Sequence, residues 1–126
     1  MRNIEEIEKG ILIETDDFNY SVGNVVNEIM FRERKLDEKE SCRIASEIIK
    51  SMVERKYVKV IKTKYKKEEE DLYSPISSAD LTAQELELFF TKPERWEAMG
   101  IFSDTLMYEL SITETGRKYL HEQVYS

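Results

Sequence analysis

The sequence predicts a mainly helical α+β fold in a single domain, and three observations support that prediction. Apolar residues recur at helical spacing through the first third of the chain, β-branched and aromatic residues then alternate with lysine, and several helix starts carry capping residues. A chain of 126 residues can bury roughly two-thirds of its unfolded surface in one core. We therefore expect residues 1–126 to form one domain.

Two amphipathic helices are expected at the start of the chain. Residues 4–14 carry isoleucines and a leucine at the spacing of one helix face. Polar, turn-favouring residues over 16–21 then end that helix. The second helix, over residues 22–34, has Ser21 as its N-cap and an apolar stripe that faces a core.

A third helix is expected over residues 38–55. Asp37 and Glu40 stand three positions apart, which is the spacing of a capping box, and an acidic first turn suits the helix dipole. The apolar face of this helix should join the stripe of the second helix. The residues that we expect to be almost fully buried together are Met30, Ile48, Ile49 and Met52.

A β-hairpin should follow the third helix. Residues 57–64 alternate apolar side chains with lysine, which is a strand pattern. The charged run over 66–71 cannot pack in a core, so we place it at the hairpin tip. Residues 72–76 return as an edge strand, because Pro75 has no amide proton to donate to a further neighbour.

The second half of the chain is expected to hold short helices and one more strand. Thr82 and Glu85 form a capping box at the start of a helix over 83–90. The remaining expected elements are helices over 93–99 and 114–124 and a strand over 105–112.

Two segments resemble the winged helix-turn-helix superfamily of bacterial regulators. Residues 45–60 are similar to the third helix of such a domain running into the first strand of its wing. Residues 110–120 are similar to the strand-to-helix junction after the wing, whose common form is leucine, threonine, an acidic residue, glycine and a basic residue. The resemblance implies a winged-helix core over residues 1–77, with a helical extension and a C-terminal strand and helix over 78–126 packing on it. Either the wing carries an insertion, or the domain closes at Ser77 and the remainder is an added cap.

Charge is distributed unevenly along the chain. The net charge of −7 is the wrong sign for a partner of phosphates. Residues 1–31 carry a net charge of −5, residues 32–67 carry +7 and residues 68–126 carry −9. The positive block coincides with the third helix and the first wing strand, which such domains offer to DNA. The residues expected to contact nucleic acid are Lys39, Arg43, Lys50, Lys62, Lys64, Lys66 and Lys67.

The positive block does not by itself require a nucleic-acid partner. Lysines along a strand also protect an exposed edge from aggregation, and the acidic residues at the start of the third helix would face phosphates. The leading hypothesis is a nucleic-acid-binding transcription regulator or accessory factor of bacterial or phage type. The alternative is an acidic protein-binding protein, such as a toxin immunity protein or an inhibitor, on the same scaffold. A homodimer formed through the terminal helices is compatible with either function.

The sequence offers no catalytic or metal-binding set. Cys42 and His121 are the only cysteine and the only histidine, which excludes an internal disulfide and a structural zinc site. We therefore expect no enzyme activity, no cofactor and no metal. The apolar runs are too short to cross a bilayer and the N-terminus lacks a signal-peptide pattern, so we expect a cytoplasmic protein without membrane contact.

Cys42 lies in the apolar stripe of the third helix, so we predict that its thiol is shielded and unreactive. A thiol reagent should modify it slowly in the native protein and rapidly after denaturation. Rapid labelling of the native protein would instead indicate an accessible nucleophile.

Overall fold

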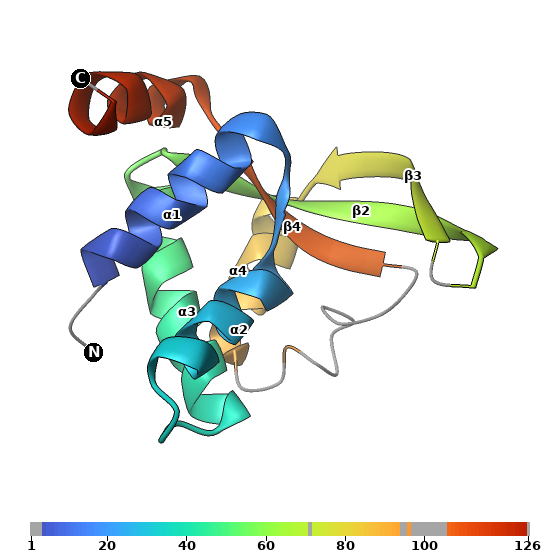
Figure 1. The fold of residues 1–126 in the computed structure, drawn as a ribbon. Coiled ribbons are helices and arrows are strands. Elements are labelled where there is room, and N and C mark those ends of the chain that lie inside the picture. The colour runs from blue at the N-terminus through green and yellow to red at the C-terminus, as the bar shows by residue number, and fades with distance from the viewer. Residues whose placement is uncertain (1–3, 71, 94–95, 97–105, 126) are drawn as a thin grey trace.

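The chain forms an α+β fold with an antiparallel sheet, as expected from the sequence (Figure 1). The computed structural model describes residues 4–70, 72–93, 96 and 106–125. Its elements in chain order are α1 (Ile4–Asp17), β1 (Tyr20–Ser21), α2 (Val22–Arg32), α3 (Glu38–Glu54), β2 (Val58–Glu69), β3 (Leu72–Asp80), α4 (Ala83–Thr91), β4 (Leu106–Ile112), α5 (Glu114–Tyr119) and the π-helix η2 (Leu120–Val124).

The strand order in the sheet is β1-β4-β2-β3, with every neighbouring pair antiparallel. The last strand in the sequence, β4, therefore lies inside the sheet, between β1 and β2, and not at its edge. Because β2 and β4 are neighbours in the sheet, β3 and α4 form an insertion between them. The boundary expected at Ser77 falls inside β3, which continues to Asp80.

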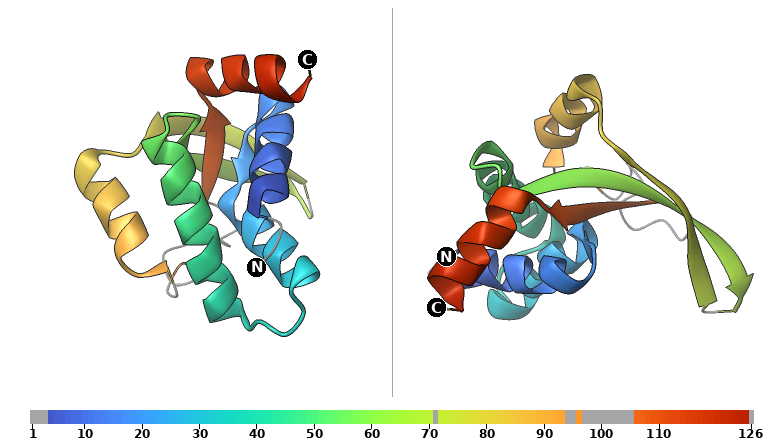
Figure 2. Two further views of the ribbon diagram at one scale, coloured as in Figure 1. Left: turned by 90° about the vertical axis from the view of Figure 1, so that its left-hand side faces the viewer. Right: turned by 90° about the horizontal axis from the view of Figure 1, so that it is seen from above.

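The core forms where α1, α2 and α3 pack at one end of the sheet (Figure 2). Val60 of β2 and Leu110 of β4 are paired in register and buried, and they face the apolar stripes of the helices. Ile49 and Met52 are fully buried from α3. Complete burial of a side chain of this size stabilises the fold by about 1.5–3 kcal/mol.

Helix caps fix where α2, α3 and α4 begin. The Ser21 side chain accepts a hydrogen bond from the Gly23 amide, and that of Asp37 accepts one from the Glu40 amide at 2.8 Å. Thr82 and Glu85 form the expected capping box, in which each side chain accepts from the other's backbone amide. Such caps stabilise a helix by about 1 kcal/mol each.

Several sequence-based expectations need correction. Helix α1 continues to Asp17, and the segment expected only to break it also contributes the short strand β1. Met30 is only partly buried, although Ile48 is buried as expected, because Met30 lies at the edge of the α2 stripe. The helix expected over 93–99 lies largely outside the described residues.

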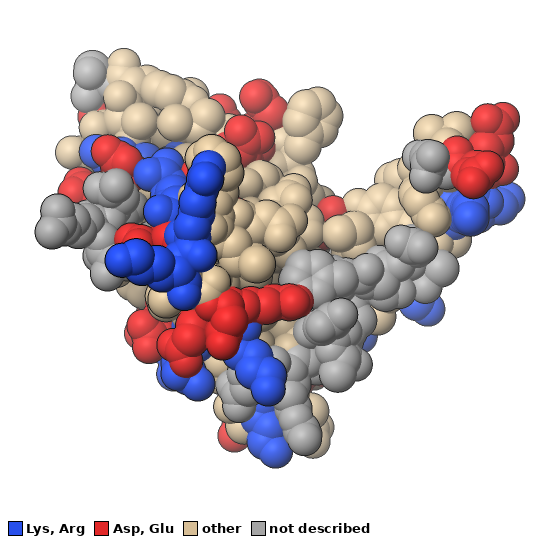
Figure 3. Space-filling model, turned by 60° about the horizontal axis from the view of Figure 1, so that its bottom comes forward, with Lys and Arg blue, Asp and Glu red and all other residues tan. Residues whose placement is uncertain are grey.

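The charged run expected at the hairpin tip mostly belongs to a strand. Strand β2 continues to Glu69, and Lys66 and Lys67 pair with Ser74 and Tyr73 of β3. The register between β2 and β4 ends at Lys64↔Leu106, so in the described chain the outer part of β2 pairs with β3 alone. We call the end of the hairpin from Lys64 outward, which comprises residues 64–70 and the returning residues 72–77 of β3, the hairpin arm. It projects away from the helices (Figures 1 and 3).

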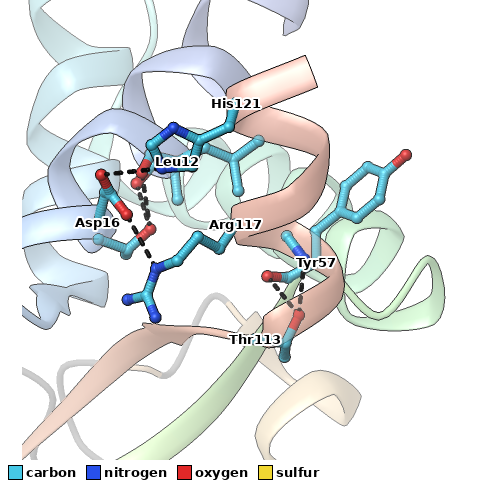
Figure 4. A network of polar contacts seen from close by, with 9 residues as sticks. Leu12, Asp16, Tyr57, Thr113, Arg117 and His121 are labelled. Carbon is cyan, nitrogen blue, oxygen red and sulfur yellow. Dashed lines mark hydrogen bonds and ion pairs between the residues drawn. The ribbon is translucent and has the colours of Figure 1, made fainter. Parts of the chain in front are cut away.

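A polar junction attaches the C-terminal helix to the body of the protein (Figure 4). The Thr113 amide and hydroxyl both donate to the Tyr57 carbonyl at 3.0 Å. The Asp16 carboxylate accepts from the Arg117 Nε at 3.0 Å and lies 3.7 Å from the His121 ring. Thr113 therefore has a structural role, because it joins the start of α5 to the turn after α3 through the Tyr57 carbonyl.

Gly116 and Gly10 provide a matched pair of tests for this packing. A Cβ atom on Gly116 would lie 2.8 Å from the Tyr57 carbonyl carbon and overlap its oxygen, whereas one on Gly10 would meet nothing within 4 Å. We predict that Gly116→Ala lowers the free energy of unfolding by about 2 kcal/mol or more. Gly10→Ala should raise it by about 1 kcal/mol, because alanine favours a helix interior. Urea unfolding of both variants measures these changes. Equal changes in the free energy of unfolding would contradict the close approach of Gly116 to the Tyr57 carbonyl.

Candidate nucleic-acid interface

Three of the predicted contact residues lie exposed on α3. Arg43 and Lys50, two turns apart, project from the helix on the side away from the core, as expected, and Lys39 precedes them. The Arg43 guanidinium, however, donates to Glu40 at 2.6 Å, and the exposed Glu47 stands between Arg43 and Lys50 in the sequence.

The exposed charges of α3 do not form a positive surface. This helix carries three basic and four acidic side chains, for a net charge of −1. Figure 3 shows Lys and Arg interleaved with Asp and Glu over the face that it presents. Carboxylates beside the basic groups would repel phosphates, so α3 offers them little net attraction.

The lysines at the base of β2 are neutralised by carboxylates of the insertion. The Lys59 ammonium lies 3.0 Å from Asp80 at the end of β3. The Lys62 ammonium donates to Glu85 of α4 at 2.6 Å, and both side chains are about one-third exposed. The bond from Lys62, together with one from the Thr82 backbone, lowers the pKa of the Glu85 carboxyl. Lys62, one of the residues expected to contact nucleic acid, is therefore engaged in an ion pair within the protein.

The lysines of the hairpin arm are exposed to solvent. Lys64, Lys66 and Lys67 form no ion pair within the described part of the chain. The exposed residues Glu68, Glu69 and Glu70 follow them directly. Figure 3 accordingly shows basic and acidic side chains next to each other at the far end of the arm. Three of the seven predicted residues thus lie together on a projecting element that a polyanion could reach.

A partly buried polar contact lies where the arm leaves the sheet, and the sequence did not predict it. The Tyr65 hydroxyl donates to the Glu109 carboxylate of β4 at 2.6 Å, and Glu109 is only 6% exposed. Nearby, the Thr63 and Ser78 hydroxyls are 2.9 Å apart and link β2 to β3. Burial, followed by the bond to Glu109, raises the pKa of Tyr65 to about 12. Only the β2–β4 register brings these residues together, so no local sequence pattern could have indicated the contact.

Neither an exposed cysteine nor a metal centre is found among the described residues. Cys42 is buried, with 3% of its surface exposed, which confirms its expected position in the core. No group of three or more histidine, cysteine, aspartate and glutamate side chains in the described ranges is arranged to hold a metal ion. Among those same residues, no helix combines the length and apolarity needed to cross a membrane.

Comparisons with protein-family models, curated proteins and solved structures found no match to this chain. Its function is therefore inferred from the geometry of these surfaces.

The Tyr65–Glu109 contact should make the stability of the protein depend on pH in the alkaline range. The pKa of Tyr65 is raised from its usual 10.0 to about 12, so the folded state favours the neutral phenol. The resulting stability is fully present below pH 10 and is lost as the pH rises through about 12. In an ultraviolet titration, Tyr65→Phe should remove one phenol that ionises near pH 12, and Glu109→Gln should lower the midpoint of that phenol. Loss of a phenol that ionises near 10 would contradict the contact.

Proposed function

We propose that this protein is a winged-helix protein that binds nucleic acid, with the lysines of the hairpin arm as its main contacts. Three helices followed by a charged hairpin have the element order of such a domain. Strands β2 and β4 are antiparallel neighbours, and β4 leads directly into the Thr113–Gly116 junction. They correspond to the two wing strands, which makes β3 and α4 an insertion in the wing.

The observation that carries the proposal is the position of Lys64, Lys66 and Lys67. They are exposed on an element that projects from the body, and within the described residues they have no acidic ion-pair partner. A phosphate neutralised by such a lysine releases condensed counterions, which lowers the logarithm of the affinity linearly with the logarithm of salt concentration. Glu68, Glu69 and Glu70 equal the three arm lysines in number, so the attraction comes from individual exposed lysines on a projecting element and not from a net positive charge.

The same geometry predicts little discrimination between sequences. In helix-turn-helix proteins the recognition helix reads bases with its N-terminal residues, and here the start of α3 carries Asp37, Glu38 and Glu40. Contacts from the arm to phosphates position a protein on a duplex without specifying a sequence. We therefore propose an accessory role in transcription, or a regulator that gains specificity from a partner.

The test is a salt titration of binding to a fluorescent DNA duplex. Lys64→Ala/Lys66→Ala/Lys67→Ala should weaken binding and reduce the salt slope by about 0.9 for each phosphate that is no longer neutralised. Arg43→Ala/Lys50→Ala should have a smaller effect, because Arg43 is already paired with Glu40.

A matched control removes three lysines that lie at the surface elsewhere, with Lys9→Ala/Lys92→Ala/Lys118→Ala. This control changes the net charge equally and should leave the salt slope unaltered. Absence of binding to duplex DNA or RNA by the intact protein at about 50 mM salt would refute the proposal. Equal effects of the arm variant and the control would refute the assignment to the arm.

A further inference from the structure

A groove runs between α3 and α4 on the surface of the protein. The two helices lie beside each other and run in opposite directions (Figure 2). The groove has a volume of about 480 Å³. Its walls include Lys50, Val53 and Glu54 of α3 and Leu86, Glu87 and Phe90 of α4.

Helix α4 is fixed in place, so the groove exists before any ligand arrives. The buried Phe89 ring stacks on Trp96 at 4.7 Å, and the Trp96 indole donates to the Phe89 carbonyl at 2.8 Å. The Lys62–Glu85 pair holds the first turn of the same helix to β2. With Phe89 directed into the core, Leu86 and Phe90 are left to line the groove.

The floor of the groove is apolar and its rim is charged. Val53, Leu86 and Phe90 are partly exposed and line it together. Glu54, Glu87 and Lys50 are exposed along it, for a net charge of −1. A ligand that complements this groove has an apolar face flanked by basic groups.

We propose that the groove binds one amphipathic α-helix of a partner protein, with basic residues placed against Glu54 and Glu87. Helix α4 has nine residues and is therefore about 13 Å long, which matches apolar anchors at positions i, i+3 or i+4 and i+7 of a bound helix. The bound helix would also cover Lys50, which is one of the residues expected to contact nucleic acid. None of the three arm lysines lines the groove. The proposal therefore stands independently of nucleic-acid binding.

The experiment uses a fluorescent synthetic peptide and the full chain. The peptide is an amphipathic helix of about 14 residues, or roughly four turns, with leucine at i, i+3 and i+7 and lysine beside them. A second peptide has glutamate in place of lysine, and a third has serine in place of leucine. Binding is followed by fluorescence anisotropy, and circular dichroism confirms that each variant is folded.

The test variant is Glu54→Lys/Glu87→Lys, which reverses two groove charges without touching the core. We expect about a tenfold weaker affinity for the lysine peptide, because two attractions become repulsions, and a tighter affinity for the glutamate peptide. The control Glu14→Lys/Glu122→Lys makes the same change in net charge on α1 and η2, away from the groove. It should alter either affinity by no more than about twofold, since distant exposed charges are screened.

Three outcomes would overturn the proposal. These are failure of the lysine peptide to bind, equal binding of the serine peptide, or equal effects of the test and control variants. Self-association of the protein that disappears in the test variant but not in the control would show that a second copy occupies the groove, which also contradicts a partner helix. Lys64→Ala/Lys66→Ala/Lys67→Ala should bind the peptide as the unmodified protein does, so failure of the nucleic-acid proposal can be told apart from failure of this one.

Discussion

The close approach of the α5 backbone to the Tyr57 carbonyl is the constraint on which the rest of the structure depends. At the end of α3, Lys56 adopts a left-handed conformation with φ 64°, and the Tyr57 amide bonds back to the Met52 carbonyl. This turn costs about 1–2 kcal/mol for a residue with a side chain, but it directs the chain into β2 and presents the Tyr57 carbonyl to Thr113. Because Gly116 has no Cβ, the first turn of α5, which begins at Glu114, can lie against the Tyr57 carbonyl, and this holds the end of β4 beside β2.

Local sequence patterns predicted the helices well because their determinants are local. Ser21, Asp37 and Thr82 act as caps within three residues of their own position, and the apolar stripes need only a period of 3.6. Strand pairing is different. Nothing near β4 in the sequence specifies that it lies between β1 and β2, and a strand of two residues such as β1 carries no periodic signal at all. The β2 strand likewise continues through a charged run, because pairing with β3 satisfies its backbone groups whatever its side chains are.

The candidate site was predicted less well, because net charge along the sequence ignores partners brought from elsewhere by folding. The +7 of residues 32–67 implied a continuous basic surface. In the structure, Lys59 and Lys62 meet Asp80 and Glu85 of the insertion, and Arg55 bonds to Glu8 of α1. Lys64, Lys66 and Lys67 on the hairpin arm form no such pair among the described residues, and neither do the exposed Lys39 and Lys50 of α3.

The insertion between β2 and β4 accounts for both surfaces of this protein. Without it, Lys59 and Lys62 would extend the basic stripe of β2 to its base and bring phosphates next to α3. With it, Asp80 and Glu85 neutralise those two lysines, and the helix that supplies Glu85 also supplies one wall of the groove. The pair between Lys62 and Glu85 therefore has opposite effects on the two kinds of partner. It pairs a positive charge that the proposed phosphate-binding surface would otherwise include, and it holds the helix that forms one wall of the groove.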